Sequence, residues 1–364
     1  MTRADPGHAG PPTLAGRLER GLAAIWWAAS PGLAGGLLWP LSLVYRLLSR
    51  IARLRAGPPA ALPVPVIVVG NLVVGGTGKT PIVIALVQAL RAAGRHPGVI
   101  SRGHGRRPAA GSARGTEDGD IVAVTPASTP SEAGDEPLLV ARRTGVPVFV
   151  GRRRALVAGR LCSRHPEVDV IVSDDGLQHR ALPRVAEIVV FDDRGAGNGL
   201  LLPAGPLREP LPASLRAGTW VVYSGAQRST PLPGVHAPRV ARRAVALEAW
   251  ATGAPGGDEP LAALRGRRMT ALAGIGAPEQ FFAMLEAAGI QIDRLPCRDH
   301  ADHAQAPWPP GTREVITTEK DAVKLAALPL PGVRVWVVPL DCDLPDTLVR
   351  EVLRLAPRPQ EVTR

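Results

Sequence analysis

The fold is decided by residues 68–81, which read VVGNLVVGGTGKTP. A short apolar run, LPVPVIVVG, leads into this stretch, and KTPIVIALVQALRAAG follows it with the spacing of an amphipathic helix. The order of strand, glycine-rich loop and helix is the context of a phosphate-binding P-loop. Backbone N–H groups at the start of such a helix bind phosphate oxygens, so we expect a nucleotide site here.

The loop departs from the usual Walker A spacing. Val73 stands where a glycine is usual, and the glycines are instead doubled ahead of Gly78. This GGxGKT pattern resembles the deviant P-loops of signal-recognition GTPases and chromosome-partitioning ATPases. The residues expected to bind the nucleotide are Gly75, Gly76, Thr77, Gly78, Lys79 and Thr80, with the Thr80 hydroxyl on Mg²⁺. The loop alone leaves both ATP and GTP open.

The stretch VDVIVSDDGLQH, residues 168–179, predicts a strand that ends in two acids. Asp174 and Asp175 are candidates for a Walker B carboxylate, which reaches Mg²⁺ directly or through water. Adjacent side chains at a strand end point to opposite sides, so we expect at most one direct ligand. Gln178 is a further candidate for contact with nucleotide or metal. The alternative is a solvated turn, which Gly176 would suit.

Two basic loops follow predicted strands, SRGHGRR at 101–107 and GRRRALVAGR at 151–160. Guanidinium groups bind phosphate through paired hydrogen bonds, so these loops suit a phosphorylated ligand. Together with an arginine of the later motif LLPAGPLREP, they provide the candidates for a substrate phosphate, which are Arg102, Arg106, Arg152 and Arg208. The alternative for these loops is an exposed basic surface.

The stretch EAGDEPLLVARR, residues 132–143, predicts a helix that opens with two acids. The helix dipole favours Asp135 and Glu136 at this end, which is a sufficient structural explanation. The functional alternative is that a carboxylate beside the transferred phosphate accepts the proton of the acceptor hydroxyl. Glu136 is also a candidate Mg²⁺ ligand.

A further cluster, CRDHADH, occupies residues 297–303. Cys297, His300 and His303 resemble metal ligands in type, but the spacing lacks the second pair that a zinc site needs. The alternative is that Asp299 orients His300 as a base across a cleft between lobes.

The chain has 364 residues, a formal net charge of +11 and three cysteines far apart in the sequence. Its charge favours anionic partners such as nucleic acid, anionic lipid or phosphorylated substrates. The aromatic residues are not interleaved with basic runs, so we expect no nucleic-acid partner. The odd, scattered cysteines exclude a disulfide framework and fit a reducing compartment. Only Lys79, Lys320 and Lys324 are lysines, and all other basic residues are arginine.

The N-terminal part contains GLAAIWWAASPGLAGGLLWPLSLVY, residues 21–45, without any charged residue and with arginines on both sides. About 20 apolar residues span a bilayer. Pro31 and Pro40 interrupt the run, and its tryptophans are typical of the headgroup level. We therefore expect a broken helical anchor lying on the membrane, with a single span or a buried helical hairpin as alternatives.

Short apolar runs alternate with helical stretches through the middle of the chain, which predicts a mostly parallel sheet with helices on both faces. The bridge QRSTPLPGVHAPRV suggests a boundary near residue 230. The expected organisation is a membrane-associated helical segment at 1–60, a P-loop α/β domain at 61–230 and a smaller α/β lobe at 231–364 that closes over the site.

The motifs together resemble one family. In order they are VGNLVVGGTGKTP, SRGHGR, GDEP, DDGLQH, GNGLLLPAGPLREP, RDH and TTEKDAVKL. They are similar to those of the tetraacyldisaccharide 4′-kinases, inner-membrane enzymes of lipid A synthesis in Gram-negative bacteria. The resemblance implies transfer of the γ-phosphoryl group of ATP, with Mg²⁺, to the 4′-hydroxyl of a tetraacyl glucosamine disaccharide 1-phosphate.

The resemblance also implies roles for individual residues. Asp135 of GDEP acts as the base, and a histidine of the DH motif, His300, supports it together with Asp299. The second copy, Asp302-His303, leaves open which histidine acts. The resemblance further implies a site at the cytoplasmic face of the inner membrane, with the protein peripheral or anchored by its N-terminal segment, and it implies no obligate protein partner. A regulatory ATPase or GTPase is the alternative, but TTEKD has the wrong spacing for the guanine-reading NKxD motif.

Overall fold

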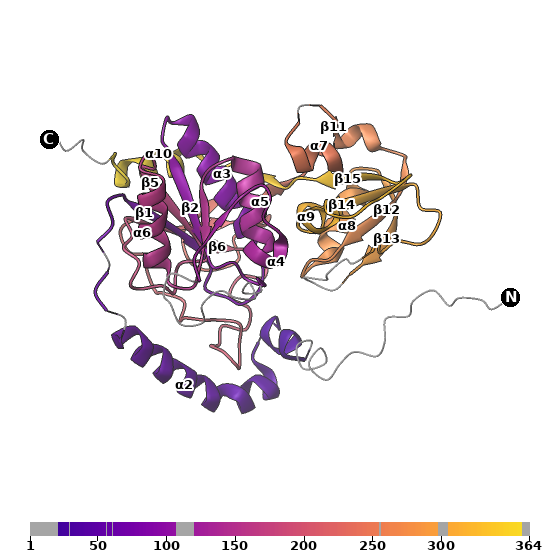
Figure 1. Ribbon diagram of the computed structural model, residues 1–364. Coiled ribbons are helices and arrows are strands. Elements are labelled where there is room, and N and C mark those ends of the chain that lie inside the picture. Colours follow the sequence, from indigo (N-terminus) through magenta and orange to yellow (C-terminus); the bar gives the residue numbers. More distant parts are fainter. Residues whose placement is uncertain are drawn as a thin grey trace.

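The computed structural model describes residues 21–28, 30–55, 57–59, 61–106, 120–254, 256–297 and 305–358. Two α/β lobes lie side by side, and a long helix, α2 (Gly32–Arg55), runs along one side of the first lobe (Figure 1). The predicted α/β class, with a mostly parallel main sheet, is confirmed.

The first lobe is built on an eight-stranded sheet in the order β3-β4-β2-β5-β1-β6-β7-β8. All neighbours pair in parallel except β3 with β4. The central strands are buried on both faces, which explains why they read as continuous apolar runs. The strands are β1 (Val66–Gly70), β2 (Pro97–Ser101), β3 (Val122–Val124), β4 (Val148–Val150), β5 (Val170–Asp174), β6 (Ala186–Phe191), β7 (Thr219–Tyr223) and β8 (Val235–His236).

Helices cover both faces of this sheet. Side chains alternate along β1, so Ile67 and Val69 join the buried cluster that includes α3, α5 and α10. Val66 and Val68 join the cluster on the other face, with α6. The helices of this lobe are α3 (Lys79–Ala92), α4 (Pro130–Ala133), α5 (Asp135–Thr144), α6 (Arg154–Arg164) and α10 (Asp346–Leu355).

The second lobe has a six-stranded sheet in the order β11-β10-β15-β14-β12-β13. Strands β13, β12, β14 and β15 are parallel, and β10 and β11 add an antiparallel edge. The elements are β10 (Arg243–Ala246), α7 (Leu247–Thr252), β11 (Asp258–Pro260), η1 (Leu261–Leu264), β12 (Arg268–Ala273), α8 (Pro278–Ala287), β13 (Gln291–Pro296), β14 (Glu314–Thr318), α9 (Glu319–Leu325) and β15 (Arg334–Val338).

The chain crosses between the lobes twice. On the way out it forms β9 (Arg239–Val240), which pairs antiparallel with β16 (Asp341–Cys342) on the way back. Helix α10 then packs on the first lobe, where Leu348 shares a buried cluster with Leu86 of α3. The prediction that residues 231–364 form a single lobe therefore does not describe α10, nor β8, which pairs in the first sheet.

Helix α2 lies against the first lobe through a few polar contacts. Ser42 Oγ donates to the carbonyl of Leu201 at 2.8 Å, and the Tyr45 hydroxyl donates to that of Arg208 at 3.1 Å. The expected break at Pro31 is present, since α2 begins at Gly32. A break at Pro40 was also expected, and this is wrong because the helix continues through it. Among the described helices, none has the length and apolarity needed to cross a membrane.

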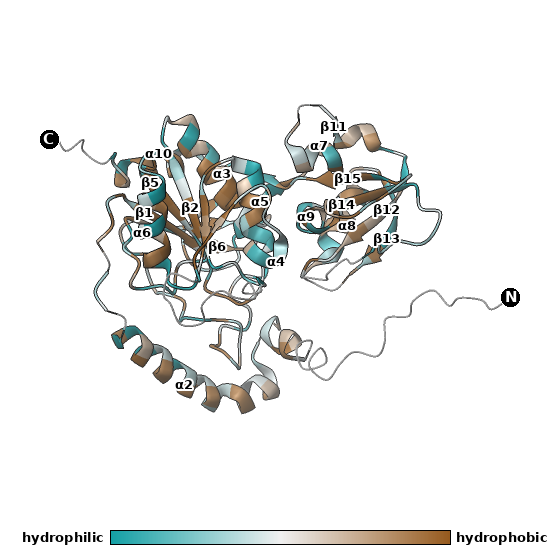
Figure 2. Ribbon diagram, viewed as in Figure 1, coloured by the Kyte–Doolittle hydropathy of each residue, from teal (hydrophilic) through white to brown (hydrophobic). Residues whose placement is uncertain are grey.

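The other side of α2 is apolar and exposed. Figure 2 shows hydrophobic residues along the side of α2 that faces away from the sheet. The exposed large side chains of this helix are Leu33, Leu37, Trp39, Leu41, Leu43, Val44, Leu47, Leu48 and Leu54. Such a contiguous apolar surface is typical of a protein or membrane contact.

A buried ion pair joins the two lobes. Arg143 of α5 donates to both carboxylate oxygens of Glu319 of α9, at 2.9 and 2.8 Å, and also pairs with Asp341. The Glu319 carboxylate further accepts the indole N–H of Trp250 at 3.1 Å. Burial raises the pKa of Glu319, although Arg143 opposes this. The contact between the lobes therefore depends on a bidentate arginine that offsets the desolvation of a buried acid.

We predict that Arg143→Met lowers the free energy of unfolding by about 3–5 kcal/mol, because it leaves a buried carboxylate without its cation. Urea unfolding at pH 8, followed by circular dichroism, measures the change. The matched control is Arg294→Met, because Arg294 forms exposed pairs with Glu279 and Glu286. The control should leave the unfolding midpoint unchanged. Equal shifts for the two variants would contradict the role given to Arg143.

Candidate active site

The nucleotide loop and the acidic pair meet because β1 and β5 pair in parallel. Val69 is opposite Asp174 in this pairing, so both strands end at the same edge of the sheet. The P-loop follows β1, and the two acids stand at the end of β5. Parallel strands thus bring together two motifs that are far apart in the sequence.

Positive backbone angles shape the P-loop. Gly75 has φ 86° and Gly78 has φ 76°, in the left-handed region that favours glycine. A Cβ on Gly78 would also lie 3.1 Å from Ser224 Oγ. Lys79 and Thr80 follow at once as the first residues of α3. The loop therefore turns directly into a helix N-terminus, as anion binding requires.

Val73 has a packing role that explains its place in the loop. Its side chain is fully buried, and its backbone forms an antiparallel bridge with Leu207. Val74 N–H also donates to the carbonyl of Pro206 at 2.9 Å. The segment before the doubled glycines thus belongs to the core, and the phosphate-binding turn begins only at Gly75.

The two acids have different surroundings. Asp174 is buried, and one of its oxygens accepts from Ser101 Oγ at 3.1 Å. Burial, followed by the charge of Glu136, raises the pKa of Asp174 to about 7, while Lys79 opposes the shift. Burial also favours the neutral form of Asp175, but Lys79 and Arg208 outweigh it and lower the pKa of that carboxyl.

Asp175 is the centre of a polar group at this edge. Lys79 Nζ lies 3.5 Å from Asp175 Oδ1, and Arg208 Nη1 lies 3.3 Å from Oδ2. Arg208 also donates to Gln178 Oε1 at 3.4 Å, and Gln178 Nε2 donates to the carbonyl of Asn71 at 3.3 Å. The structure thus brings five predicted site residues together, which are Lys79, Asp174, Asp175, Gln178 and Arg208.

The other three predicted phosphate arginines lie in the loops that follow the neighbouring strands β2 and β4, where Arg102 comes directly after Ser101, the partner of Asp174. Arg102, Arg106 and Arg152 line a cavity of about 220 Å³ with Gly103, His104, Gly105 and Asp120. Arg106 is already paired with Asp120, and Arg152 N–H donates to the same carboxylate at 2.7 Å. The predicted set therefore divides, with Arg208 at the nucleotide edge and the other three in the loops after β2 and β4.

Arg154 is a residue that the sequence analysis did not separate from its neighbours. Its side chain is buried at 2% exposure, and within the described residues two of its nitrogens, Nε and Nη2, have no hydrogen-bond partner. Burial lowers the pKa of Arg154 to about 10. Burial, together with Arg154 and Arg102, lowers the pKa of His179 to about 4, so this imidazole is neutral near pH 7. Arg152 and Arg153 are exposed, and nothing in this run of three arginines predicts that the third is buried.

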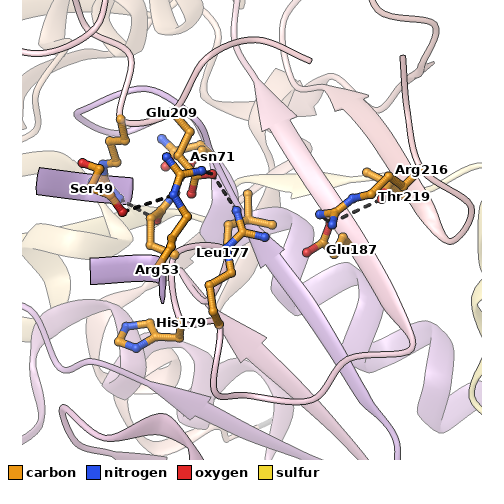
Figure 3. A network of polar contacts seen from close by, with 12 residues as sticks. Ser49, Arg53, Asn71, Leu177, His179, Glu187, Glu209, Arg216 and Thr219 are labelled. Carbon is orange, nitrogen blue, oxygen red and sulfur yellow. Dashed lines mark hydrogen bonds and ion pairs between the residues drawn. The ribbon is translucent and has the colours of Figure 1, made fainter. Parts of the chain in front are cut away.

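Two arginines after the DDGLQH motif hold its loop in place, and Figure 3 labels three residues that they contact, Leu177, Glu187 and Glu209. Arg184 donates to the carbonyl of Leu177 at 3.1 Å and to Glu187 at 2.9 Å. Arg180 pairs with Glu209 at 2.6 Å, and Arg53 of α2 reaches the same carboxylate at 3.4 Å. The acidic loop is therefore fixed to β6 and, through Glu209, to the N-terminal helix.

The acids that open α5 face the second lobe. Asp135 is buried, and Lys324 Nζ lies 3.3 Å from its Oδ2. Lys320 Nζ lies 3.0 Å from Glu136 Oε1. Helix α9, which carries both lysines, starts at a cap in which Thr318 Oγ1 accepts from Asp321 N–H. The sequence singled out these lysines by their rarity, but it did not predict their partners.

The predicted residues Asp299 and His300, like His303, lie outside the described residues. Cys297 is half-buried, and burial raises the pKa of its thiol. In the part of the chain that the structure describes, no group of three or more His, Cys, Asp or Glu side chains could hold a metal ion. The choice between His300 and His303 stays open.

The oxygen atoms at the nucleotide edge fit Mg²⁺. Asp174 Oδ1 is buried and, within the described residues, has no hydrogen-bond partner. Thr80 is the second residue of α3, at the same edge. Mg²⁺ in nucleotide sites takes only one or two protein oxygens, together with phosphate and water. One carboxylate and one hydroxyl therefore suffice, and the salt-bridged Asp175 is the less suitable direct ligand.

Three comparisons place the chain among known proteins. The sequence profile of the tetraacyldisaccharide-1-P 4′-kinases matches residues 34–356. The tetraacyldisaccharide 4′-kinase of Leptothrix cholodnii is 47% identical over 355 residues, covering 94% of this chain and 97% of the relative. That of Methylibium petroleiphilum is 48% identical over 333 residues, covering 89% and 90%.

A solved structure agrees with these relatives. The crystal structure of LpxK from Aquifex aeolicus, an "apo" form in complex with ATP, aligns with a TM-score of 0.70 and 26% sequence identity. The alignment covers 89% of this chain and 99% of that one. By the family profile and by nearly full-length relatives, this chain belongs to the tetraacyldisaccharide-1-P 4′-kinase family.

Proposed function

We propose that this protein transfers the γ-phosphoryl group of ATP to the 4′-hydroxyl of tetraacyldisaccharide 1-phosphate. The observation that carries the proposal is the approach of Lys79, Asp174 and Asp175 at one sheet edge, beside the acids that open α5. Family membership supports the acceptor, since the relatives are named for this activity. It also disfavours a regulatory ATPase or GTPase.

Catalysis then depends mainly on positioning and on neutralising charge. The P-loop N–H groups and Lys79 hold the β- and γ-phosphates. Thr80 and Asp174 would hold Mg²⁺, which would supply positive charge to the transferred group. Arg208, which is 3.3 Å from Asp175, can contact a phosphate at the same edge. Arg102, Arg106 and Arg152 suit the 1-phosphate of the acceptor, because their cavity is rich in N–H donors.

Asp135 is the proposed general base. It begins α5 beside Glu136, whose charge acts on Asp174, so it lies near the phosphate-binding edge. Its contact with Lys324 favours the ionised carboxylate, which is the form that accepts a proton. His300 and Asp299 are the proposed supporting pair from the second lobe.

Helix α2 is the proposed membrane contact at the cytoplasmic face of the inner membrane. Its exposed leucines and Trp39 form an apolar side, and arginines follow in its last turns. An amphipathic helix of this kind lies in the interface with its apolar side among the acyl chains. The contact would bring the site to an acceptor that is itself a lipid.

The transfer reaction is the direct test. Purified protein with Mg-ATP and tetraacyldisaccharide 1-phosphate in detergent micelles should give a bis-phosphorylated lipid, which thin-layer chromatography with labelled ATP resolves. Hydrolysis of GTP without any transfer to the lipid would sink the proposal.

We predict that Asp135→Asn lowers kcat by roughly 10²-fold or more, as for loss of a general base. Binding of ATP, followed by calorimetry, should stay within about twofold of the original, because the phosphate-binding loop is intact. The control is Asp293→Asn, an exposed acid paired with Arg268 on the second lobe, which should keep full turnover. Unchanged turnover in Asp135→Asn would move the base to another residue.

We predict that a glutamate at Leu37, Leu41 or Leu48 reduces binding to vesicles of phosphatidylethanolamine and phosphatidylglycerol. Each change puts a charge on the apolar side of α2, and a combination of two should lower co-sedimentation by about tenfold or more. Val185→Glu is the matched control, since Val185 is exposed elsewhere on the first lobe. Equal loss in the control, or full binding in the α2 variants, argues against this contact.

A further inference from the structure

Arg194 connects the P-loop to the N-terminal segment. Its Nη2 donates to the carbonyl of Gly76 at 2.5 Å, and its guanidinium lies over the ring of Trp27, 4.3 Å from the centroid. The buried Asp192 fixes the same guanidinium, accepting from Nε at 2.9 Å and from Nη2 at 2.6 Å. One side chain therefore touches the phosphate loop and a residue that precedes α2.

The N-terminal segment is itself held firmly at this point. Asn198 N–H donates to the carbonyl of Trp26 at 2.8 Å, and Asn198 Nδ2 donates to that of Ile25 at 3.0 Å. The Trp26 indole donates to the carbonyl of Pro203 at 2.8 Å. A Cβ on Gly197 would lie 2.3 Å from the Trp26 carbonyl, so the two backbones pack closely. Trp27 is thus presented to Arg194 by a specific contact between two backbone segments.

The bond to Gly76 sets the direction of a phosphate-binding group. In a trans peptide the C=O and N–H point in opposite directions, so a carbonyl held toward Arg194 turns the Thr77 N–H the other way. The next peptide is fixed similarly, because Ser224 Oγ donates to the Thr77 carbonyl at 2.8 Å. Gly75 and Gly76 are exposed and nothing would touch a Cβ on either, so glycine freedom leaves this turn loosely determined without such bonds.

We infer that Arg194 is a positioning residue of the ATP site, and that docking of Ile25–Trp27 orders the P-loop through it. Affinity for ATP then depends on whether the N-terminal segment is seated. Trp27 restricts the guanidinium by cation–π contact, and the guanidinium restricts the Gly76 peptide. Pre-ordering a loop raises affinity because less conformational entropy is lost on binding. The inference rests on the proposed use of ATP at this loop.

Calorimetric titration of the full chain with Mg-ATP in detergent micelles tests the connection. Arg194→Met and Trp27→Ala should each raise the Kd for ATP by about 5- to 20-fold, the range of a modest coupling between two sites. Trp27→Phe keeps an aromatic face and should restore most of the affinity. With saturating ATP, kcat should stay within about twofold in all three variants, because only binding is affected. Arg216→Met, which removes a side chain that is 72% exposed, is the control and should leave Kd unchanged.

The double variant Trp27→Ala with Arg194→Met separates a connection from two independent effects. If Trp27 acts through Arg194, the double variant binds ATP no more weakly than Arg194→Met alone. Multiplied effects, an unchanged Kd in Trp27→Ala, or a loss of kcat with an unchanged Kd would each overturn the inference. Because binding is measured without the lipid acceptor, failure of the transfer reaction would be seen separately, as absence of product in the unmodified protein.

Discussion

Parallel pairing of β1 with β5 is the constraint on which the rest of the structure depends. It brings the P-loop and the acids of β5 to one edge, where Lys79 lies 3.5 Å from Asp175 and its charge also acts on the buried Asp174. Burial raises the pKa of Asp174, so the edge needs positive charge before this acid ionises readily. Lys79 supplies some of it, and a metal-bound nucleotide would supply the rest. The sheet thus produces a site whose charge is completed by its ligand.

The second lobe also places positive charge beside acids of the first lobe. Lys320 and Lys324 of helix α9 pair with the two acids of α5. In the other direction, Arg143 of α5 pairs with Glu319 of α9. Ion pairs of opposite direction therefore hold one face of α5 to one face of α9. A lysine serves here as a compact charge on a flexible stem, which suits a single carboxylate oxygen in a narrow space better than a planar guanidinium does.

Sequence reasoning reached the central part of the fold and of the site because those features are local. A strand, a glycine turn and a helix lie next to each other in the chain, and a pair of acids after an apolar run needs only the rule that parallel strands end together. Partners of Lys324 and the place of α10 depend on contacts between distant segments, which no local pattern encodes. Arg154 is buried and Arg152 is exposed. A run of identical side chains in the sequence does not show which of them is buried. Val73 occupies a position where a P-loop usually has glycine, and its burial and its bridge with Leu207 explain why a valine stands there.

The two crossings between the lobes have a mechanical consequence. Since β9 and β16 are hydrogen-bonded to each other, the connection is a short two-stranded ribbon rather than two separate linkers. The ribbon also lies against α3 of the first lobe, where the Cys342 thiol of β16 donates to the carbonyl of Pro81 at 3.4 Å. The connection between the lobes therefore reaches the helix that begins with Lys79 and Thr80, so the two crossings tie the second lobe to the nucleotide edge.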